Sequence, residues 1–391
     1  MSVDKKKIES LLTRGVDEVI DKVNLERKLK SGKQLRIKLG IDPTSPNIHL
    51  GRSIPLLKLR DFQELGHKAV LIIGDFTGVI GDTSDKESER PMLEDEVIKE
   101  NLRTYIKQAS KIIDINNSEV CYNSEWLDEL KYRDIGSQAD QFSLNEFISR
   151  ENIKKRLDTG KRVSLRELFY PLMQGYDSVG VRADVELGGT DQRFNLLAGR
   201  TLQRFYGQEP QDIITNPLIE GLDGRKMSSS WGNTVNLLDE PNDMFGKLMS
   251  LRDEFIIKYF TLLTRLDLDI IEQYEKEMKE GANPKDYKIK LASETVRFYY
   301  SEEDAKMAQK HFMKTVSDKE IPDDITEIKP TNYDLSTALI ESGSVKSKSE
   351  VRRLVSQNGV KINKEIADNP DIKIKPGDII QKGKIMFFKV V

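Results

Sequence analysis

One short run of apolar residues constrains the fold of this chain most strongly. Residues 69–73 read Ala-Val-Leu-Ile-Ile and end at Gly74-Asp75, so neither face of this segment carries a polar side chain. A strand that is apolar on both faces is typical of a parallel sheet with helices on each side. The preceding residues agree, because 35–41 alternate apolar and polar side chains, a proline-rich loop follows, and a helical pattern runs from about 50 to 65.

Three further strand-like segments follow at 119–122, 183–187 and 212–214, with helical patterns between them. This alternation predicts a Rossmann-like, doubly wound α/β domain. Ligands of such domains bind at the carboxyl ends of the strands. The loops after Ile41 and Ile73 are therefore the first places to expect a site.

The rest of the chain divides into smaller parts. Residues 242–310 show helical patterns without a strand signal, 317–330 lack periodicity, and the last 60 or so combine two short helices with turn-separated β segments. We expect an N-terminal helical segment at 1–32, a catalytic domain at 33–235, an all-helical domain at 236–316, a linker at 317–330 and a small α+β domain at 331–391.

Composition excludes several classes of protein. Apolar residues make up 37% and charged residues 32%, and no apolar run approaches the roughly 18 residues that span a bilayer. The N-terminus is charged without a following apolar stretch, which predicts no secretory signal. One cysteine, Cys121, excludes an intramolecular disulfide, and three histidines offer little to a metal. We expect a cytoplasmic protein with no membrane partner and no resident metal.

The charge is unevenly distributed. The whole chain carries a formal net charge of −3, yet residues 331–391 hold 11 Lys and Arg against 7 Asp and Glu. A modestly basic tail thus follows an acidic body.

The sequence His49-Leu-Gly-Arg52 opens the first helix after the proline-rich loop. A histidine beside a glycine at a helix N-terminus lets a phosphate approach the backbone amides and the positive end of the helix dipole. For these four residues alone, a capping histidine without a ligand remains the open alternative.

A second phosphate-suited segment, Lys226-Met-Ser-Ser-Ser230, lies in a glycine-rich loop after the last strand. One lysine and three hydroxyls can close over a polyphosphate, although a solvated turn is the alternative for this segment alone. The chain contains neither the P-loop pattern nor the dinucleotide-binding pattern of glycines. Two such segments bracketing one α/β domain favour a nucleotide site of another kind.

With these two segments the chain resembles the class I aminoacyl-tRNA synthetases, whose signatures HIGH and KMSKS follow the first and last strands. Further motifs resemble the bacterial tyrosyl members of that family: Gly40-Ile-Asp-Pro-Thr44, the run from Gly66 to Asp82, Tyr170-x-x-x-Gln174-x-x-Asp177 and Gly188-Gly-Thr-Asp-Gln192. The resemblance spans nearly the whole chain, with the motifs in the same order.

The spacing of Tyr170, Gln174 and Asp177 also indicates a polar site without any resemblance to a family. They fall at i, i+4 and i+7, which places three polar groups on one helical face among apolar neighbours. A solvated face is the alternative, but such faces usually carry Lys or Glu and this one carries neither.

The resemblance implies roles for individual residues. In the family, the Gln and Tyr of this helix hold the substrate's α-amino group, the Asp accepts from its phenol, and the residue at Asp191 faces the ribose. The implied tyrosine site is Lys38, Asp82, Tyr170, Gln174, Asp177 and Gln192. The implied ATP site is Gly40, Asp42, Thr44, His49, Gly51, Asp191, Lys226 and Ser229. The implied catalytic groups are Thr44, His49, Arg52, Lys86, Arg90, Lys226 and Ser228.

Three positions depart from the family pattern. Arg52 stands where the second His of HIGH is usual, and Ser229 replaces the second Lys of KMSKS, which removes one charge from the pyrophosphate clamp. Lys86 and Arg90 are expected to share that work. Lys38 stands where many relatives place a tyrosine that bonds the substrate phenol, so Asp177 is expected to recognise that hydroxyl largely alone.

The C-terminal residues resemble a small RNA-binding module found in a ribosomal protein and in pseudouridine synthases. Its expected RNA contacts are Lys346, Lys348, Arg352, Arg353 and Lys361. A generic solvated charged face is the alternative. The resemblance further implies a homodimer with its interface in an inserted segment at about 124–162, and the partners L-tyrosine, ATP and tRNA(Tyr).

The implied reaction is tyrosine activation by ATP, with magnesium brought by ATP, followed by transfer to tRNA. Synthetases of this kind reject phenylalanine without editing, because its binding leaves a buried polar group unpaired, and no segment here looks like an inserted editing domain. Three alternatives remain: a coenzyme-forming nucleotidyltransferase with a HIGH-type motif, a non-catalytic RNA-binding descendant, and tryptophan as the substrate.

Overall fold

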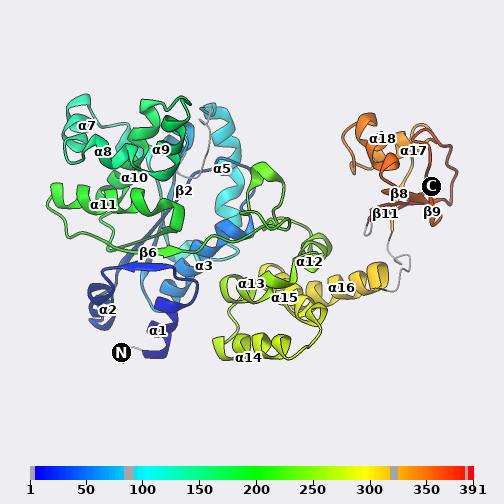
Figure 1. Cartoon of the computed structure of the whole chain (residues 1–391), viewed down its shortest axis with the longest axis horizontal. Coiled ribbons are helices and arrows are strands. Elements are labelled where there is room, and N and C mark those ends of the chain that lie inside the picture. The colour runs from blue at the N-terminus through cyan, green and yellow to red at the C-terminus, as the bar shows by residue number, and fades with distance from the viewer. Residues whose placement is uncertain (1–4, 83–91, 318–324, 384–385) are drawn as a thin grey trace. The chain divides into compact units, whose positions relative to one another are not determined.

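The computed structural model describes residues 5–82, 92–317, 325–383 and 386–391 (Figure 1). The chain forms two compact units. The first comprises Met1–Asp239 with Ser250–Leu291, and the second comprises Glu240–Met249 with Ala292–Val391. The helices expected as one domain at 236–316 are therefore shared between the two units.

A six-stranded sheet forms the centre of the first unit, in the order β1-β6-β5-β2-β3-β4. Five strands run parallel, and β1 pairs antiparallel with β6 at one edge. Their bounds are β1 Glu18–Ile20, β2 Arg36–Ile41, β3 Lys68–Ile73, β4 Glu119–Tyr122, β5 Val185–Gly189 and β6 Asp212–Asn216. The predicted doubly wound α/β fold is confirmed, and all five residues of the apolar run 69–73 are buried in β3.

The N-terminal segment at 1–32, which we expected to be helical, contains two helices and also a short strand. Strand β1 lies between α1 (Lys5–Thr13) and α2 (Lys22–Lys30). Three residues give too little periodicity to mark a strand in the sequence, and what makes β1 a strand is its pairing with the distant β6.

Helices cover the sheet on both sides, because the strand order reverses between β2 and β5. Residue Gly175 of α10 allows α10 and α11 to pack closely, since a Cβ there would lie 3.0 Å from the backbone of Ala198. The covering helices are α3 Leu50–Glu64, α4 Asp75–Ile80, α5 Asp95–Ala109, α10 Leu165–Gly180 and α11 Arg193–Phe205, and the unit also holds α13 Ile256–Leu263 and α14 Leu268–Lys279.

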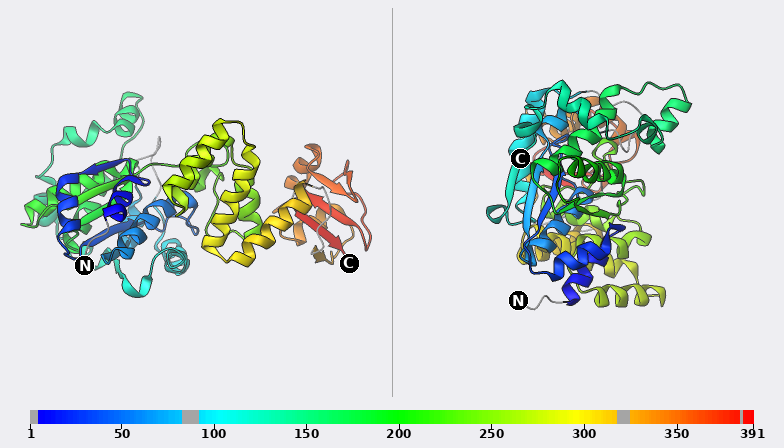
Figure 2. Two further views of the ribbon diagram at one scale, coloured as in Figure 1. Left: turned by 90° about the horizontal axis from the view of Figure 1, so that it is seen from below. Right: turned by 90° about the vertical axis from the view of Figure 1, so that its left-hand side faces the viewer.

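Four short helices fill the chain between β4 and α10: α6 Ser124–Leu127, α7 Tyr132–Ala139, α8 Leu144–Ile148 and α9 Glu151–Asp158. In both views of Figure 2 the teal part of this segment projects from the sheet. Helix α9 is joined to α10 by a buried ion pair in which Arg156 Nη1 lies 2.5 Å from Glu167 Oε2.

The second unit contains further helices and the tail. Its elements are α12 Pro241–Met249, α16 Glu302–Phe312, α17 Leu335–Glu341, α18 Lys348–Ser356, β7 Thr326–Ile328, β8 Val360–Ile362, β9 Glu365–Ile366, β10 Ile379–Lys382 and β11 Met386–Val390, while α15 Pro284–Tyr299 belongs to both units. The tail sheet has the order β7-β11-β10-β8-β9 and shares an apolar core with α17 and α18. Within the described ranges, no helix is long and apolar enough to cross a membrane.

Candidate functional site

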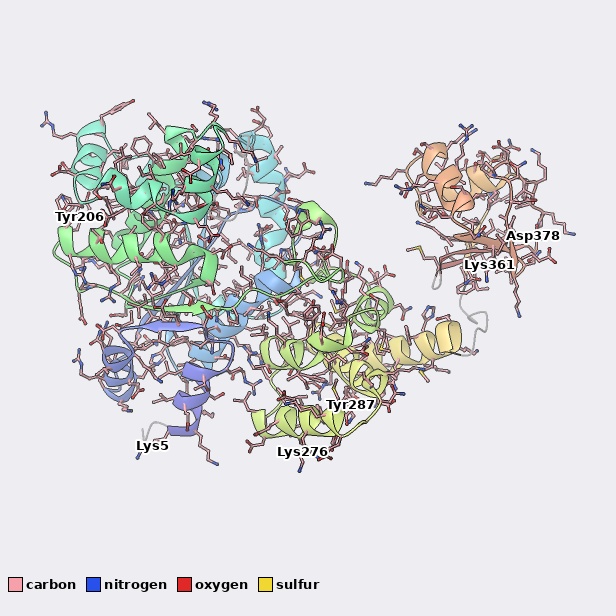
Figure 3. All side chains as sticks on the ribbon, viewed as in Figure 1. Lys5, Tyr206, Lys276, Tyr287, Lys361 and Asp378 are labelled. Carbon is pink, nitrogen blue, oxygen red and sulfur yellow. The ribbon has the colours of Figure 1, made fainter. Side chains whose placement is uncertain are left out.

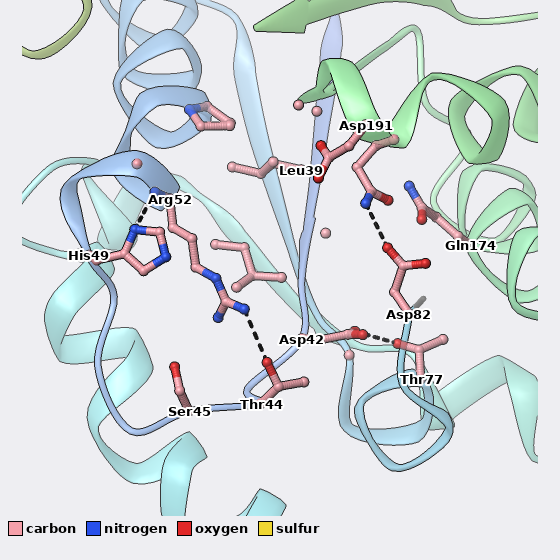
Figure 4. Close-up of a pocket in the computed structure, with 18 of the residues that line it drawn as sticks. Leu39, Asp42, Thr44, Ser45, His49, Arg52, Thr77, Asp82, Gln174 and Asp191 are labelled. Atoms are coloured by element: carbon pink, nitrogen blue, oxygen red, sulfur yellow. Dashed lines mark hydrogen bonds between the residues drawn. The ribbon is translucent and has the colours of Figure 1, made fainter. Parts of the chain in front are cut away.

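A cavity opens at the carboxyl ends of β2 and β5, where the strand order reverses (Figure 4). It brings together residues from β2, α3, α10, β5 and the loop after β6. The predicted residues that line it are Gly40, Asp42, Thr44, His49, Gly51, Arg52, Asp82, Tyr170, Gln174, Asp177, Asp191, Gln192, Lys226, Ser228 and Ser229. Lys38 is not among the lining residues, and Lys86 and Arg90 lie outside the residues that the structure describes.

His49 caps the N-terminus of α3. The backbone N–H of Arg52 donates to His49 Nδ1 at 3.3 Å, so the imidazole proton resides on Nε2. The pKa of His49 is lowered to about 3, first by burial and then by the neighbouring charges of Arg52 and Lys226. His49 is therefore a neutral hydrogen-bond donor at physiological pH.

The first backbone amides of α3 have partners within the chain. The N–H of Leu50 donates to the carbonyl of Val235 at 2.8 Å, and the N–H of Gly51 donates to Met227 Sδ at 3.3 Å. The sequence-based expectation that a phosphate approaches these amides is therefore not supported, because the loop after β6 already covers them. The side-chain donors that face the cavity here are those of His49 and Arg52.

Arg52 is held in the cavity by two neutral groups. Its Nη1 donates to the hydroxyl of Tyr105 at 3.0 Å and its Nη2 donates to Thr44 Oγ1 at 3.1 Å. Neither partner neutralises the guanidinium, so its full charge is available to an anion. This arrangement suits a phosphate group near the start of α3.

The loop cation Lys226 lies across the cavity. Its Nζ is 2.9 Å from Asp191 Oδ2, and both side chains are partly exposed. Asn233 fixes the loop, because its Oδ1 accepts from Ser228 N at 2.9 Å and its Nδ2 donates to Asp223 Oδ1 at 2.7 Å. The loop thus places the ammonium group of Lys226 against the carboxylate of Asp191.

The other side of the cavity ends at a buried carboxylate. Asp177 is 3% exposed, and its two oxygens accept from Trp126 Nε1 at 2.8 Å and from Asn123 Nδ2 at 3.3 Å. Burial raises the pKa of Asp177 to about 7, against the opposing effects of Lys38 and of the two donors. A buried carboxylate with neutral donors behind it is suited to accept a hydrogen bond from a hydroxyl of a ligand.

Between these ends lie two pairs of polar side chains. The hydroxyl of Tyr170 donates to Asp42 Oδ2 at 2.8 Å, and Gln192 Nε2 donates to Asp82 Oδ2 at 2.7 Å. Burial, followed by the charges of Asp42 and Asp82, raises the pKa of Tyr170. Two carboxylates and a tyrosine hydroxyl in this position suit an ammonium group.

Sequence reasoning missed Asn123 and Trp126. Asn123 directly follows the strand 119–122, so its place at the carboxyl end of a predicted strand was a usable signal. Trp126, on α6, offered no comparable signal, since its role depends on a contact with α10 that lies 51 residues further along the chain.

The predicted RNA contacts lie in the tail. Lys346, Lys348, Arg352 and Arg353 are exposed on or just before α18, and Lys361 is partly exposed on β8 (Figure 3). They offer phosphate-binding charge without acting as core residues.

Residues 30–317 match the family of class I tRNA synthetases for tryptophan and tyrosine. The chain belongs to this family. Residues 335–380 match the S4 domain. The resemblance expected from the His49 and Lys226 segments is therefore confirmed.

Relatives and solved structures agree with this membership. The tyrosine–tRNA ligase of Thermotoga maritima is 46% identical over 97% of this chain and 96% of its own length. The tyrosine–tRNA ligase of Carboxydothermus hydrogenoformans is 43% identical over 100% of this chain and 99% of its own length. A tyrosyl-tRNA synthetase from Archaeoglobus fulgidus, solved with L-tyrosine, has a TM-score of 0.62 at 24% identity and covers 78% of this chain and 99% of that chain, which is a likeness of fold.

Proposed function

We propose that this chain activates L-tyrosine with ATP to tyrosyl-adenylate and pyrophosphate, and then transfers the tyrosyl group to the 3′ end of tRNA(Tyr). Two tyrosine–tRNA ligases that resemble it over nearly their full lengths support this activity. The observation that carries the proposal is one cavity with a buried carboxylate, Asp177, at one side and the cations Arg52 and Lys226 at the other.

The tyrosine substrate lies with its phenol against Asp177 and its ammonium group near Tyr170, Gln174 and Asp82. The substrate carboxylate then faces the nucleotide. Gln192, which donates to Asp82, completes this part of the site. A substrate without a hydroxyl leaves the Asp177 carboxylate buried and unpaired, which costs free energy.

ATP lies along β2 and the start of α3, with its ribose at Asp191 and its phosphates at Thr44, His49 and Arg52. The tyrosine carboxylate is already ionised, so its attack on the α-phosphate needs no general base. The requirement is in-line positioning and stabilisation of the charge that develops on the pyrophosphate. Arg52, Lys226, Ser228 and neutral His49 supply donors for that charge, with Lys86 and Arg90 proposed to assist them.

Magnesium arrives with ATP as part of the substrate and screens its phosphates. In the second step a ribose hydroxyl of the tRNA attacks the carbonyl carbon of the adenylate, and AMP leaves. Because the reaction needs tRNA and ATP together, we propose that the protein acts in the cytoplasm.

Amino-acid-dependent exchange of pyrophosphate into ATP tests the proposal. Exchange should appear with tyrosine and stay near background with phenylalanine, tryptophan and the other amino acids. Exchange with tryptophan alone would reassign the substrate. Absence of exchange with every amino acid would favour a non-catalytic RNA-binding protein. Arg52 and Ser229, which depart from the catalytic motifs of the family, are the sequence features that favour this alternative.

Removal of residues 331–391 should separate the two steps. The proposed tyrosine and ATP sites lie wholly before residue 231, so exchange should remain near normal. Transfer to tRNA should fall sharply, because the deletion removes a net positive domain and its salt-dependent share of RNA binding. A parallel fall of both activities in a folded truncated protein would contradict this division of labour.

We propose that the protein is a homodimer with its interface at the inserted helices. Apolar side chains are exposed along this segment and the adjoining helices, where Tyr206 lies at the outer edge of the unit (Figure 3). The exposed residues are Tyr132, Leu144, Leu157, Leu165, Phe169, Phe205 and Tyr206, of which Tyr132 is 96% and Leu165 is 72% exposed. An apolar surface of this kind is typical of an interface.

The variant Leu165→Glu should convert the dimer to a monomer in sedimentation equilibrium, because it places a charge among these apolar residues. Val23→Glu is the matched control, since Val23 is also exposed but lies on α2, outside the inserted segment. A monomeric unchanged protein, or a dimeric Leu165→Glu variant, would exclude this interface.

A further inference from the structure

Lys38 and Glu186 form an ion pair that is wholly enclosed by the fold. They face each other in the ladder between β2 and β5, and Lys38 Nζ lies 2.8 Å from Glu186 Oε1. Lys38 is 0% exposed and Glu186 is 1% exposed. Because two buried charges lose their hydration, such a pair is a costly way to fill a core, and an apolar pair would fill it as well.

The ammonium group of Lys38 has an acceptor for each of its three protons. Besides Glu186, it donates to the carbonyl of Gln174 at 2.9 Å and to Ser178 Oγ at 2.8 Å. Ser178 Oγ in turn donates to Glu186 Oε2 at 3.1 Å, and Gln211 Nε2 donates to the same oxygen. The network joins both strands to α10.

This network supports the residues of α10 that face the cavity. The two α10 residues that Lys38 bonds, Gln174 and Ser178, stand on either side of Asp177 in the helix. The side-chain Nε2 of Gln174 also points to Glu186 Oε1, at 3.4 Å, which leaves the amide oxygen of Gln174 as an acceptor for the cavity. An amide held in this orientation is suited to an ammonium group of a ligand.

The charges that face Asp177 come from two strands and from its own helix. Lys38 on β2 favours its ionised form, whereas Glu186 on β5 disfavours it. Tyr170 on α10 interacts with Asp177 electrostatically. From β4 and α6 come only the neutral donors Asn123 and Trp126. Among the described residues that shift the pKa of Asp177, Lys38 is therefore the cation that stabilises its ionised carboxylate.

We infer that Lys38 is a specificity-determining positioning residue of the tyrosine site. Through Glu186 it orients the amide of Gln174, and through its charge it keeps the Asp177 carboxylate an acceptor for the substrate phenol. The inference rests on the proposed function. It also explains how a site with a lysine at this position recognises a phenol without direct contact between Lys38 and the ligand.

The pH profile of tyrosine-dependent exchange tests the inference. Since ionised Asp177 is the acceptor, kcat/KM for tyrosine should be full above the pKa of Asp177, about 7, and fall as the pH decreases through it. Lys38→Met should move this midpoint upward by about one unit, equivalent to a roughly tenfold loss of kcat/KM below pH 6. It should also reduce the preference for tyrosine over phenylalanine. His49, with a pKa of about 3, does not titrate in this range.

Two further variants make the result specific. Glu186→Gln should move the midpoint downward, because it removes the charge that opposes ionisation of Asp177, and Lys38→Arg should keep the midpoint close to that of the unchanged protein. The matched control is Lys58→Met: Lys58 is 2% exposed and donates to two backbone carbonyls of the N-terminal segment. Its loss should lower the melting temperature without moving the midpoint.

A loss of activity in Lys38→Met that is equal at every pH would overturn the inference, since a purely structural residue behaves in that way. If Lys38→Met does not fold, the Glu186→Gln profile decides, and an unmoved or raised midpoint overturns the inference. Failure of the unchanged protein to exchange with tyrosine would instead remove the proposed function.

Discussion

Replacing Lys226 by alanine is expected to slow adenylate formation about a hundredfold or more, while tyrosine affinity stays close to that of the unchanged protein. Lys226 contacts Asp191, the proposed ribose acceptor, and not the residues proposed to hold tyrosine. Its charge therefore matters when the pyrophosphate leaves. Single-turnover formation of tyrosyl-adenylate, together with equilibrium binding of tyrosine, measures the two quantities separately.

Lys258→Ala is the control for this experiment. Lys258 is also a partly exposed lysine in an ion pair, with Glu220 at 2.8 Å, and it does not line the cavity. Its loss should leave the rate of adenylate formation within about twofold, because a partly exposed ion pair outside the cavity contributes little. An unchanged rate in Lys226→Ala would remove Lys226 from the mechanism, and an equally slow Lys258→Ala would indicate a general effect of lost charge.

Replacing Asp177 by alanine should lower kcat/KM for tyrosine about a hundredfold and should reduce the preference for tyrosine over phenylalanine by a similar factor. The variant removes the proposed phenol acceptor and leaves the indole N–H of Trp126 and one N–H of the Asn123 amide without their acceptor. Exchange kinetics with both amino acids give the ratio directly.

A second buried aspartate provides the comparison. Asp212 is 0% exposed and pairs with Lys28 at 3.1 Å, but it does not line the cavity. Asp212→Asn should lower stability and leave the ratio of tyrosine to phenylalanine unchanged. If Asp177→Ala rejected phenylalanine as well as the unchanged protein does, another group would have to recognise the phenol.

Most strands of the sheet could be predicted because a buried strand shows a local run or alternation of apolar residues. The apolar run 69–73 became β3 and the helical pattern from 50 to 65 became α3 within one residue. Strand β1 escaped prediction because three residues at a sheet edge depend on a partner strand and not on their own periodicity.

In the candidate site too, residues in local motifs could be predicted, whereas contacts between distant segments could not. His49, Arg52, Lys226 and Asp177 could be predicted from short motifs, and the cavity contains all four. Lys38 was placed against the substrate by resemblance alone, whereas the structure places it behind the cavity. Its partner Glu186 lies 148 residues away, and only the register of two parallel strands brings the pair together.

The backbone amides of α3 show a second kind of contact that the sequence could not predict. A histidine and a glycine at a helix start predict an anion site on the amides, but Met227 and Val235 already occupy two of them. The sequence shows that a loop follows β6, but it does not show that the loop folds back onto α3.

The burial of Asp177 links the response of the protein to pH with its choice of amino acid. At Asp177, the proposed acceptor of the substrate phenol, a pKa of about 7 places the loss of charge near neutrality, whereas His49, with a pKa of about 3, stays neutral there. Discrimination between tyrosine and phenylalanine would then weaken as the pH falls through this pKa. Substitutions of Lys38 or Glu186, the charges beneath this carboxylate, would then change the pH dependence of the reaction and its amino-acid selectivity together.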